Sequence, residues 1–471
     1  MKRRHLLQAL PLAFLPLSHV AQSATKDLWD VLIVGAGGAG LSAAVAAAEA
    51  GAQRILIIEK APIAGGHTVL SAGTVTVTAG DEHDPDPTHT LIRDLVRAGG
   101  REALAKTFAM NATDAVQWLG EMGVAWEPKL FQAVGSGVRR NLSTGSHRGG
   151  FDIIQALSLR ARDLGVKVQF ETKATSLITH NGRVTGVRTQ TPQGEKTFSA
   201  RGVILATGGF GANKTMRRQW DPRITENVGT TADVLGLTPD GAKGDGILLG
   251  QTVGAKLVDM DAIECIPYAG GRVLDYVGAE IWLNAEGDRF VSEEATFDKI
   301  AEAMREQTGS MMWTITDSQS RKGANFGTKL ANGIVRQADS LSALSQATGI
   351  SLEKLSYTLN AYNRSATTGK DRRFGRTTFT QTIDVPPYYY GIEKLSVHIT
   401  MGGLLIDTDA RALDGAENPI PGLFAAGETT GGLHGRRRMG GNALTEVLVF
   451  GRIAGQSAAR RAQSLANQPN A

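Results

Sequence analysis

The sequence predicts an α/β protein, and the observations that predict it are three apolar segments that each lead into a glycine turn. They lie at residues 30–40, 203–209 and 422–428 of a chain of 471 residues. Short apolar runs followed by glycine are typical of buried parallel strands that end in loops. A chain of this length is expected to form two or three structural units with a substantial core.

The composition is that of an ordinary globular protein, with 42% apolar and 20% charged residues, which excludes a disordered chain. Glycine is in excess, with 57 residues or about 12% against a usual ~7%. Without a Gly-X-Y period, these glycines are expected in loops that closely approach another group. The 50 basic and 46 acidic residues give a formal charge of +4. This near balance gives no reason to expect nucleic acid or an anionic membrane surface as a partner.

Residues 1–24 have the pattern of an export signal. Lys2, Arg3 and Arg4 precede an apolar stretch that ends at Leu17, and small residues follow it. The arginine pair with two leucines after it is typical of a twin-arginine signal, which exports bacterial proteins already folded around a cofactor. A general secretion signal with two chance arginines is the alternative. We therefore expect an enzyme of the periplasm, with a net charge of +1 once the leader is removed.

The rest of the chain gives no sign of a membrane anchor or of a metal centre. No later stretch offers ~20 continuous apolar residues, so no transmembrane segment is expected. Cys265 is the only cysteine, which excludes a disulfide, a CxxCH haem attachment and an iron–sulfur ligand set. We expect Cys265 to be a buried thiol and predict no metal site.

The first folded element is a strand, a glycine loop, a helix and a second strand. Residues 30–34 are the first strand, 35–40 read Gly-Ala-Gly-Gly-Ala-Gly, 41–50 are an alanine-rich helix, and 54–58 are a strand followed by Glu59. In such a unit the first glycine permits a tight turn, the second lets the backbone approach a pyrophosphate, and the last lets helix and strand pack closely. The helix N-terminus faces the phosphates and the acidic residue binds a ribose. The segment predicts a Rossmann-like dinucleotide-binding unit, without deciding between FAD and NAD.

The two later segments favour FAD. A strand at 203–205 leads into Ala206-Thr207-Gly208, and a strand from Gly422 ends in Gly427-Glu428. Gly440 and Gly441 then open a helix that runs to Ala459. Such segments suit a long cofactor that lies across the whole sheet. The helix start at 441–444 would stabilise negative charge on a reduced flavin ring through its dipole.

Together with His398-Ile399-Thr400-Met401-Gly402-Gly403, these segments resemble the flavoprotein family of fumarate reductases, succinate dehydrogenases and soluble flavocytochromes c. The resemblance runs from about Trp29 to Arg460. It implies a Rossmann-like FAD-binding domain over residues 25–259 and 398–471. An α+β capping domain would be inserted at 260–397, with the substrate between the cap and the flavin ring.

The resemblance also implies which residues bind FAD. Expected in the first half are Gly35, Ala36, Gly37, Gly38, Ala39, Gly40, Glu59, Lys60, Gly65, Gly66, His67, Thr68, Ala72, Gly73 and Ala174. Expected in the second half are Ala206, Thr207, Gly208, Asp245, Gly427, Glu428, Arg438, Gly441, Asn442, Ala443 and Leu444.

The resemblance implies hydride transfer between flavin N5 and a carbon next to a carboxylate or carbonyl. His398 and Arg438 match two substrate-binding residues of the family. Arg438 would hold a carboxylate through a two-pronged hydrogen bond, and His398 would donate another.

Four departures argue against fumarate as the substrate. Fumarate reductases of the family use an arginine as proton donor, and Phe297 stands in its place. Ile266 replaces a cap histidine, and the Glu and Arg of the proton relay correspond to Val273 and Tyr276. The apolar cap suits a larger and more apolar acid. A tyrosine could replace the proton donor, with Tyr276 and Tyr268 as first candidates and Tyr388, Tyr389 and Tyr390 behind them.

Two questions stay open from the sequence. His67-Thr68-Val69 resembles the succinate dehydrogenase segment whose histidine bonds covalently to FAD, and a non-covalent polar neighbour is the alternative. The chain carries no haem motif or second nicotinamide fingerprint, so we expect a separate redox partner, for example a periplasmic c-type cytochrome. Besides a reductase of an unsaturated acid, the alternatives are a dehydrogenase or oxidase of an acid or ketone, and a flavin electron carrier without a substrate.

Overall fold

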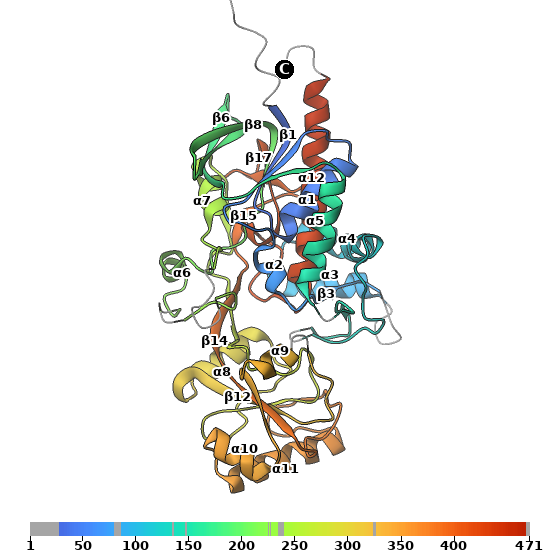
Figure 1. The fold of residues 1–471 in the computed structure, drawn as a ribbon, viewed down its shortest axis with the longest axis vertical. Coiled ribbons are helices and arrows are strands. Elements are labelled where there is room, and N and C mark those ends of the chain that lie inside the picture. Colours follow the sequence, from blue (N-terminus) through green and yellow to red (C-terminus); the bar gives the residue numbers. More distant parts are fainter. Residues whose placement is uncertain are drawn as a thin grey trace, which may run out of the picture.

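The computed structural model describes residues 28–79, 86–133, 136–146, 148–224, 226, 228–233, 240–323 and 326–467. The predicted export signal at residues 1–24 lies outside the described residues. The described chain forms two lobes, with the N-terminal and C-terminal segments together in one and most of residues 270–395 in the other (Figure 1). None of the described helices is long and apolar enough to cross a membrane.

The larger lobe is built on an eight-stranded sheet, and the three segments that predicted the fold lie side by side in it. Its main strand order is β16-β17-β8-β1-β2-β5. The central strands β17 (Pro419–Ala425), β8 (Gly194–Leu205), β1 (Leu28–Val34) and β2 (Ile55–Ile58) are all parallel to their neighbours in this series. The edges are β16 (Arg411–Leu413) and β5 (Lys167–Gln169), and β6 (Lys173–His180) with β7 (Arg183–Thr191) joins at β8. The predicted α/β class is confirmed.

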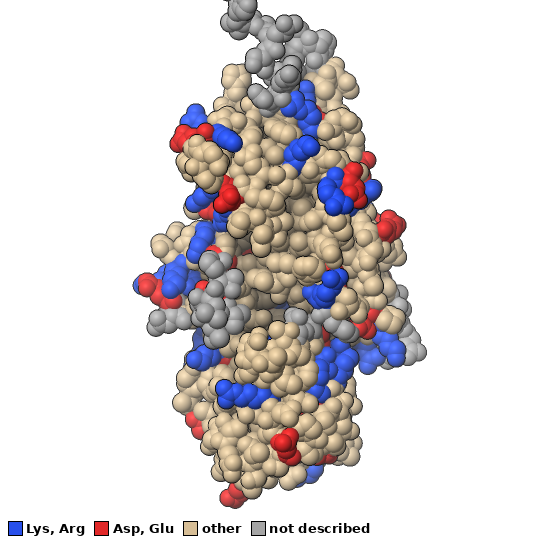
Figure 2. Space-filling view, in the orientation of Figure 1, with Lys and Arg blue, Asp and Glu red and all other residues tan. Residues whose placement is uncertain are grey.

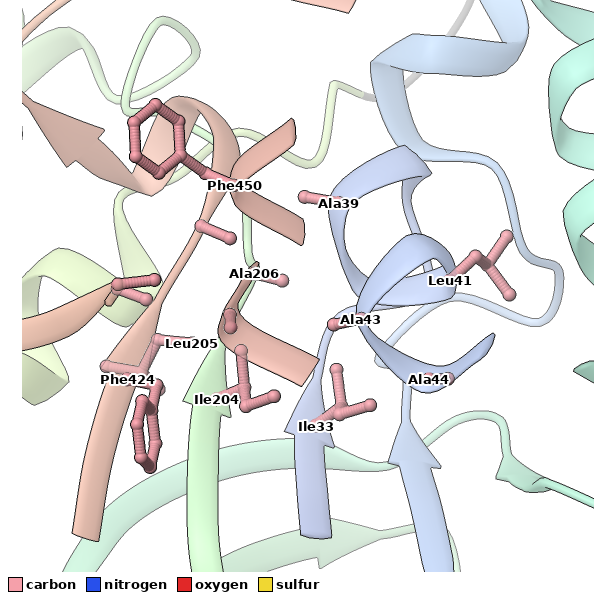
Figure 3. Close-up of a cluster of buried hydrophobic side chains, with 14 of the residues drawn as sticks. Ile33, Ala39, Leu41, Ala43, Ala44, Ile204, Leu205, Ala206, Phe424 and Phe450 are labelled. Atoms are coloured by element: carbon pink, nitrogen blue, oxygen red, sulfur yellow. The ribbon is translucent and has the colours of Figure 1, made fainter. Parts of the chain in front are cut away.

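Two helices cover this sheet at its centre. They are α1 (Gly38–Glu49) and α12 (Asn442–Ala466), and they pack against each other because a Cβ atom at Gly455 of α12 would lie 2.1 Å from the carbonyl oxygen of Ala43. Figure 3 shows Ile33, Ile204 and Phe424 on three adjacent strands, with Ile33 next to Ala43 and Ala44 of α1. The described helices on the outside are α3 (Pro87–Arg97), α4 (Glu102–Glu121) and α5 (Gly150–Asp163).

Short elements complete this lobe. The pair β3 (Val75–Thr76) and β4 (Asn141–Leu142) is antiparallel, and β9 (Leu257–Val258), β15 (Gly403–Leu405) and β18 (Thr430–Gly431) form a small sheet. The short helices are α2 (Gly66–Leu70), α6 (Lys214–Trp220) and α7 (Asp245–Thr252). Figure 2 shows basic side chains in several small groups on one face of the molecule, interspersed with acidic ones.

The second lobe is an α+β unit, as the family resemblance implied. Its sheet has the order β10-β14-β12-β11, and β13 also pairs with β14. The strands are β10 (Ile263–Pro267), β11 (Ile281–Leu283), β12 (Met311–Thr316), β13 (Val335–Ala338) and β14 (Tyr388–Thr400). The helices are α8 (Phe297–Arg305), α9 (Phe326–Ala331), α10 (Leu341–Thr348) and α11 (Leu352–Thr368). Strand β14 runs from this lobe into the larger one, so the predicted boundary at residue 397 falls within a strand (Figure 1).

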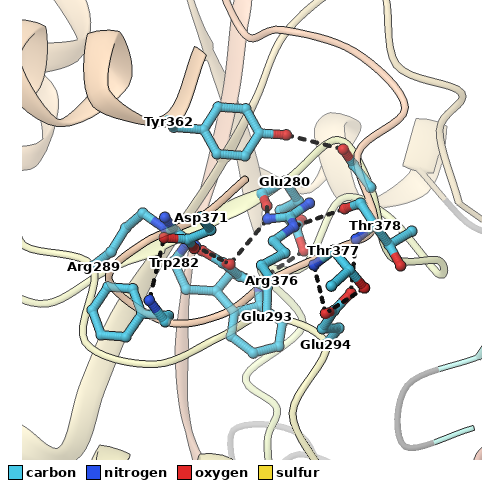
Figure 4. A network of polar contacts seen from close by, with 12 residues as sticks. Glu280, Trp282, Arg289, Glu293, Glu294, Tyr362, Asp371, Arg376, Thr377 and Thr378 are labelled. Atoms are coloured by element: carbon cyan, nitrogen blue, oxygen red, sulfur yellow. Dashed lines mark hydrogen bonds and ion pairs between the residues drawn. The ribbon is translucent and has the colours of Figure 1, made fainter. Parts of the chain in front are cut away.

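A buried network of charges holds the cap together (Figure 4). Arg289 pairs with Glu293 at 2.6 Å and with Asp371 at 2.8 Å, and Arg376 pairs with Glu293 at 3.0 Å. The neighbouring Glu280 accepts hydrogen bonds from the backbone N–H groups of the loop at 273–274 and from the indole N–H of Trp282. Buried charges need such partners. The network therefore fixes the cap loop at 272–276, most of which faces the cavity between the lobes.

Candidate active site

The glycine loop between β1 and α1 has contacts that only glycine permits. Gly35 has a φ of +108°, and a Cβ atom there would lie 2.3 Å from the carbonyl oxygen of Ala206. A Cβ atom at Gly40 would lie 1.9 Å from the carbonyl oxygen of Gly35, so α1 packs directly against the turn. At Gly37 the nearest atom to such a Cβ is the carbonyl oxygen of Gly65, 3.9 Å away. The space at the helix start is therefore open, as a bound pyrophosphate requires.

The carboxylate of Glu59 is held beside this loop. Its Oε2 accepts the N–H of Ala36 and its Oε1 accepts the N–H of Ala61, both at 2.8 Å. The N–H of Thr172 donates to the Glu59 carbonyl at 2.8 Å, which brings the start of β6, and with it the buried Ala174, close to the end of β2. A carboxylate fixed at this sheet edge suits the ribose of a dinucleotide.

Two further predicted residues bind each other. Lys60 forms an ion pair with Asp245 at 2.6 Å and donates to the Gly241 carbonyl at 2.5 Å, which ties the start of α7 to the end of β2. Thr207 accepts the N–H of Gly246 at 2.9 Å. The structure therefore gives Lys60 and Asp245 a role in joining two walls of the groove.

The segment after β2 packs against the glycine loop. Gly65 forms a bridge with Gly37, and the hydroxyl of Thr68 accepts the N–H of Gly38 at 3.3 Å. Next to them, a Cβ atom at Gly73 would lie 2.7 Å from the backbone of Gly149. The remaining predicted residues of this stretch, Gly66 and Ala72, lie in α2 and in the loop after it.

The start of α12 is anchored by side chains that the sequence did not reveal. The hydroxyl of Thr76 donates to Asn442 Oδ1 at 2.8 Å, and Asn141 Nδ2 donates to the Gly440 carbonyl at 2.9 Å. A Cβ atom at Gly441 would lie 2.3 Å from the same Asn141 nitrogen. Among the described residues, Asn442 Nδ2 is buried without a hydrogen-bond partner. An unpaired donor at a helix start fits a cofactor atom that accepts a hydrogen bond.

His67 lies between two carboxylates. Its Nε2 is 2.7 Å from Asp240 Oδ1, and its Nδ1 is 3.7 Å from Glu428 Oε2. Burial lowers the pKa of His67, but the hydrogen bonds and charges of Asp240 and Glu428 outweigh burial and raise it to about 10. The imidazole is therefore protonated at neutral pH.

The structure brings His398 and Arg438 to one cavity. His398 Nδ1 is 3.0 Å from the hydroxyl of Thr231. Burial, together with the charges of Arg438 and His67, holds the pKa of His398 well below its usual range. His398 is therefore neutral and has one ring N–H to donate. Arg438 is 7% exposed, its guanidinium lies 5.7 Å from the centre of the Phe297 ring, and it binds Glu264.

The cavity lies between the lobes and has a volume of about 340 Å³. The larger lobe contributes His67, His398, Ala443 and Leu444, and Arg438 lies among them. The cap contributes mainly apolar and aromatic groups, including Ile266, Tyr268, Val273, Leu274 and Phe297. Residues expected to touch cofactor and residues expected to touch substrate thus share one space.

Tyr276, one of the two first candidates for the proton donor, packs inside the cap. Its ring packs under the guanidinium of Arg321, 4.9 Å away, and against the small core of Val273 and Leu274. It is not among the described residues that line the cavity, and neither are Tyr388, Tyr389 and Tyr390 of β14. Tyr268 does line the cavity and takes the place of Tyr276 as the candidate proton donor.

Sequence reasoning missed several polar residues of the site. Arg272 and Lys329 line the cavity from the cap, where Lys329 Nζ donates to the Arg272 carbonyl at 2.9 Å. Burial lowers the pKa of Lys329. Asp240 and Glu264 hold the two cations His67 and Arg438. Each lies more than 170 residues from its partner, so no motif could have revealed the pairs.

These features together fit FAD. The glycine loop leaves open space for a pyrophosphate, Glu59 is held at the sheet edge where a ribose is expected, and the cavity reaches the α12 start with its unpaired donor. A long cofactor that crosses the sheet connects these points, as the order of β2, β1, β8 and β17 requires.

Comparisons with known proteins also indicate an FAD-binding protein. The model of the FAD binding domain family matches residues 30–444. The chain is 34% identical to a probable fumarate reductase of Shewanella frigidimarina, over 93% of this chain and 76% of that protein. It is 37% identical to a urocanate reductase of Eggerthella lenta, over 92% of this chain and 75% of that protein. The structure of the open conformation of a flavocytochrome c3 fumarate reductase superposes with a TM-score of 0.72 at 32% identity, covering 93% of this chain and 79% of that one.

Proposed function

This chain belongs to the FAD-dependent family of fumarate reductase and succinate dehydrogenase flavoproteins, and we propose that it reduces the carbon–carbon double bond of an unsaturated acid other than fumarate. The observation that carries the proposal is the meeting of Arg438 and His398 in one cavity whose cap wall holds Phe297 and Ile266. The polar side is equipped for an acid group. The cap wall lacks the proton-donating arginine and the histidine of the family, because Phe297 and Ile266 stand at those positions.

Arg438 and His398 hold the acid group of the substrate in this proposal. Arg438 keeps N–H groups for a ligand because Glu264 engages only its Nε and Nη2 atoms. Neutral His398 donates one further hydrogen bond, and Thr231 orients its ring. Two donors on one carboxylate place the neighbouring double bond, which lowers the barrier to reaction.

The cap wall favours an apolar remainder on that acid. Ile266, Leu274 and Phe297 cannot bind a second carboxylate, whereas they can cover an alkyl or aryl group. Fumarate would have to bury its second charge against them at a high cost. The two cations of this wall do not replace the family arginine, because Arg272 already pairs with Glu280 and burial lowers the pKa of Lys329. An aryl or alkyl enoic acid fits both walls.

Bound FAD supplies the hydride chemistry, and the chain must supply a proton to the other carbon. Tyr268 lines the cavity, and burial followed by the charge of Glu393 raises its pKa, so the phenol is protonated at neutral pH. A protonated phenol in the cavity can act as the acid. Lys329, which lines the same wall, is the second candidate.

We infer that the enzyme is exported and receives electrons from a separate protein. The arginine pair in residues 1–24 supports export by the twin-arginine route. The lack of a haem motif and of a second nicotinamide fingerprint in the sequence supports a partner such as a periplasmic c-type cytochrome.

The test is anaerobic reduction of the purified flavoprotein, followed by spectral screening for compounds that reoxidise it. We expect cinnamate-like and alkyl enoates to reoxidise the flavin and fumarate to be slow or inactive. Fumarate as the fastest oxidant would contradict the proposal. Reduction of the oxidised protein by saturated acids or ketones would favour a dehydrogenase, and hydrogen peroxide formed in air during that turnover would indicate an oxidase. A protein that no such compound affects would be an electron carrier.

A further inference from the structure

Arg438 lies in the wall between two cavities. A second cavity, of about 330 Å³, shares Phe297 and Arg438 with the cofactor cavity. Glu264 lines only the second cavity. Its Oε2 accepts hydrogen bonds from Arg438 Nη2 at 2.7 Å and from Arg438 Nε at 3.1 Å. Glu264 therefore holds the guanidinium from the side away from the substrate.

The cation expected to bind the substrate already has a counter-ion. The side chains of Arg438 and Glu264 are 5% and 4% exposed, so the pair is neutral and lies out of water. A substrate carboxylate on Arg438 would place two carboxylates on one buried guanidinium. Two like charges at such a site cannot both stay ionised without a large cost.

The other cations in the cofactor cavity do not remove this conflict. Among the described residues, His67 lies between Asp240 and Glu428, and Arg272 pairs with Glu280. Lys329 belongs to the cap wall, where it is bonded to the Arg272 carbonyl. The charge balance next to Arg438 must therefore change when an acid binds there.

We propose that a substrate carboxylate binds Arg438 together with one proton, which Glu264 takes up from the second cavity and releases when the product leaves. In this step a hydronium ion of the solvent in the second cavity gives up its proton, an O–H bond forms on the Glu264 carboxylate, and no electron moves. The inference rests on the proposed function, because it needs an acid group at Arg438.

The surroundings of Glu264 suit this role. Burial raises the pKa of Glu264, the charges of Arg438 and His434 oppose that rise, and Asp298 of α8 adds to it. On the neighbouring strand β14, Ile399 lies opposite Glu264, so the adjacent His398 is another group near enough to take the proton. Glu302 and Arg305 of α8 line the same second cavity, as do Arg436 and Arg437. The test must therefore separate Glu264 from His398.

The experiment uses oxidised holoenzyme and the probe phenylacetate, which has no pair of saturated carbons to oxidise. Calorimetric titrations between pH 6 and 9, in buffers with different ionisation enthalpies, give the number of protons taken up. We expect one proton per phenylacetate at the alkaline end, with affinity falling about tenfold per pH unit there. The uncharged phenylacetamide should bind without proton uptake and with the same affinity at each pH.

Substitutions identify the residue that takes up the proton. Glu264→Gln should abolish the uptake and bind phenylacetate at least tenfold more tightly than wild type at pH 9. Glu302→Gln, which changes an exposed carboxylate of the same cavity, should behave as wild type. If Glu264→Gln does not fold, the His398→Asn variant identifies the proton acceptor instead. Proton uptake that persists in this variant on phenylacetate binding supports Glu264, and its loss would contradict the inference.

Three results would overturn the inference. They are pH-independent binding of phenylacetate by the wild type, proton uptake that survives in Glu264→Gln, and failure of the holoenzyme to bind phenylacetate at all. The proposed function fails on a different measurement, since it requires that some enoate reoxidises the reduced flavin. An enzyme that reduces enoates but binds phenylacetate without a proton would thus contradict only the present inference.

Discussion

Tyr268 and Tyr276 lie in the same cap segment, yet only Tyr268 lines the substrate cavity. The first follows β10 directly and its backbone carbonyl accepts the hydroxyl of Ser396 at 2.7 Å. The second turns toward Arg321 in the cap. At the residue scale, a proton donor must reach the substrate, and this requirement separates two tyrosines that the sequence could not rank.

Tyr268→Phe should slow enoate-driven reoxidation of the flavin by about 100-fold, because one positioned acid typically contributes 10²–10⁴-fold. Flavin content should be unchanged. Tyr276→Phe is the matched control and should stay within about twofold of wild type. Stopped-flow absorbance of the pre-reduced protein measures both rates. Equal rates in the Tyr268 variant and wild type would contradict this assignment and leave Lys329 as the candidate proton donor.

His67 gives the second prediction at this scale. Both of its ring nitrogens face carboxylates, and the imidazole is protonated at neutral pH. A covalent bond to flavin needs a nitrogen with a free lone pair, so we expect FAD to be bound without a covalent bond. Acid precipitation should then leave the protein colourless and all flavin in the supernatant. A precipitate that stays yellow, with an intact mass increased by one flavin, would show that the histidyl bond forms after all.

At the element scale, the glycine loop shows why a strand, a turn and a helix could be predicted together. The predicted strand at 30–34 lies within β1, and the helix expected at 41–50 begins earlier, at Gly38. The last glycines of the motif form the first helical turn because Gly40 must approach the carbonyl of Gly35. The loop and the helix are therefore one unit.

Gly40→Ala should weaken this unit. The added methyl group would lie 1.9 Å from the Gly35 carbonyl, so the helix must move away from the turn and the pyrophosphate site must deform. We expect a loss of about 1–3 kcal/mol in unfolding free energy and a low flavin content. Gly415→Ala is the control, since its Cβ would meet no described atom within 4 Å. Thermal unfolding and flavin absorbance test both variants, and full FAD loading of the Gly40 variant would contradict the packing argument.

At the scale of the whole molecule, the cavity exists only because two lobes meet. Strand β14 starts in the cap and carries His398 and Thr400 to the larger lobe, where the hydroxyl and N–H groups of Thr400 bind Glu428. Glu428 in turn lies near His67. Strand β14 thus connects the cap to the cofactor groove, so a movement of the cap would displace groups beside the flavin.

The whole chain also decides how electrons arrive. The sequence has one dinucleotide-binding fingerprint, and it lies within the match to the FAD binding domain family. We therefore expect NADH to leave the flavin oxidised over minutes under anaerobic conditions, while a reduced viologen, which needs no binding site, reduces it at once. Absorbance at the flavin band measures both reactions. Rapid bleaching by NADH would remove the need for a separate redox partner.

The cofactor-binding lobe was largely predictable, because its signals are local. Tight turns and close backbone contacts demand glycine at fixed spacing, and apolar runs mark the buried strands β1, β8 and β17. The polar partners of the site were not predictable. Thr231, Asp240 and Glu264 act on groups more than 160 residues away, and nothing in the neighbouring sequence marks them.

By itself, the sequence determined the α/β class, FAD as the cofactor and the absence of the arginine that the family uses as an acid, since each depends on residue types at fixed positions. The tertiary structure alone decided which tyrosine faces the cavity, that Arg438 is already neutralised by Glu264, and that His67 is held between two carboxylates. The physical reason is that charge and protonation depend on burial and on distances of a few ångströms, which are set when segments far apart in the chain pack together.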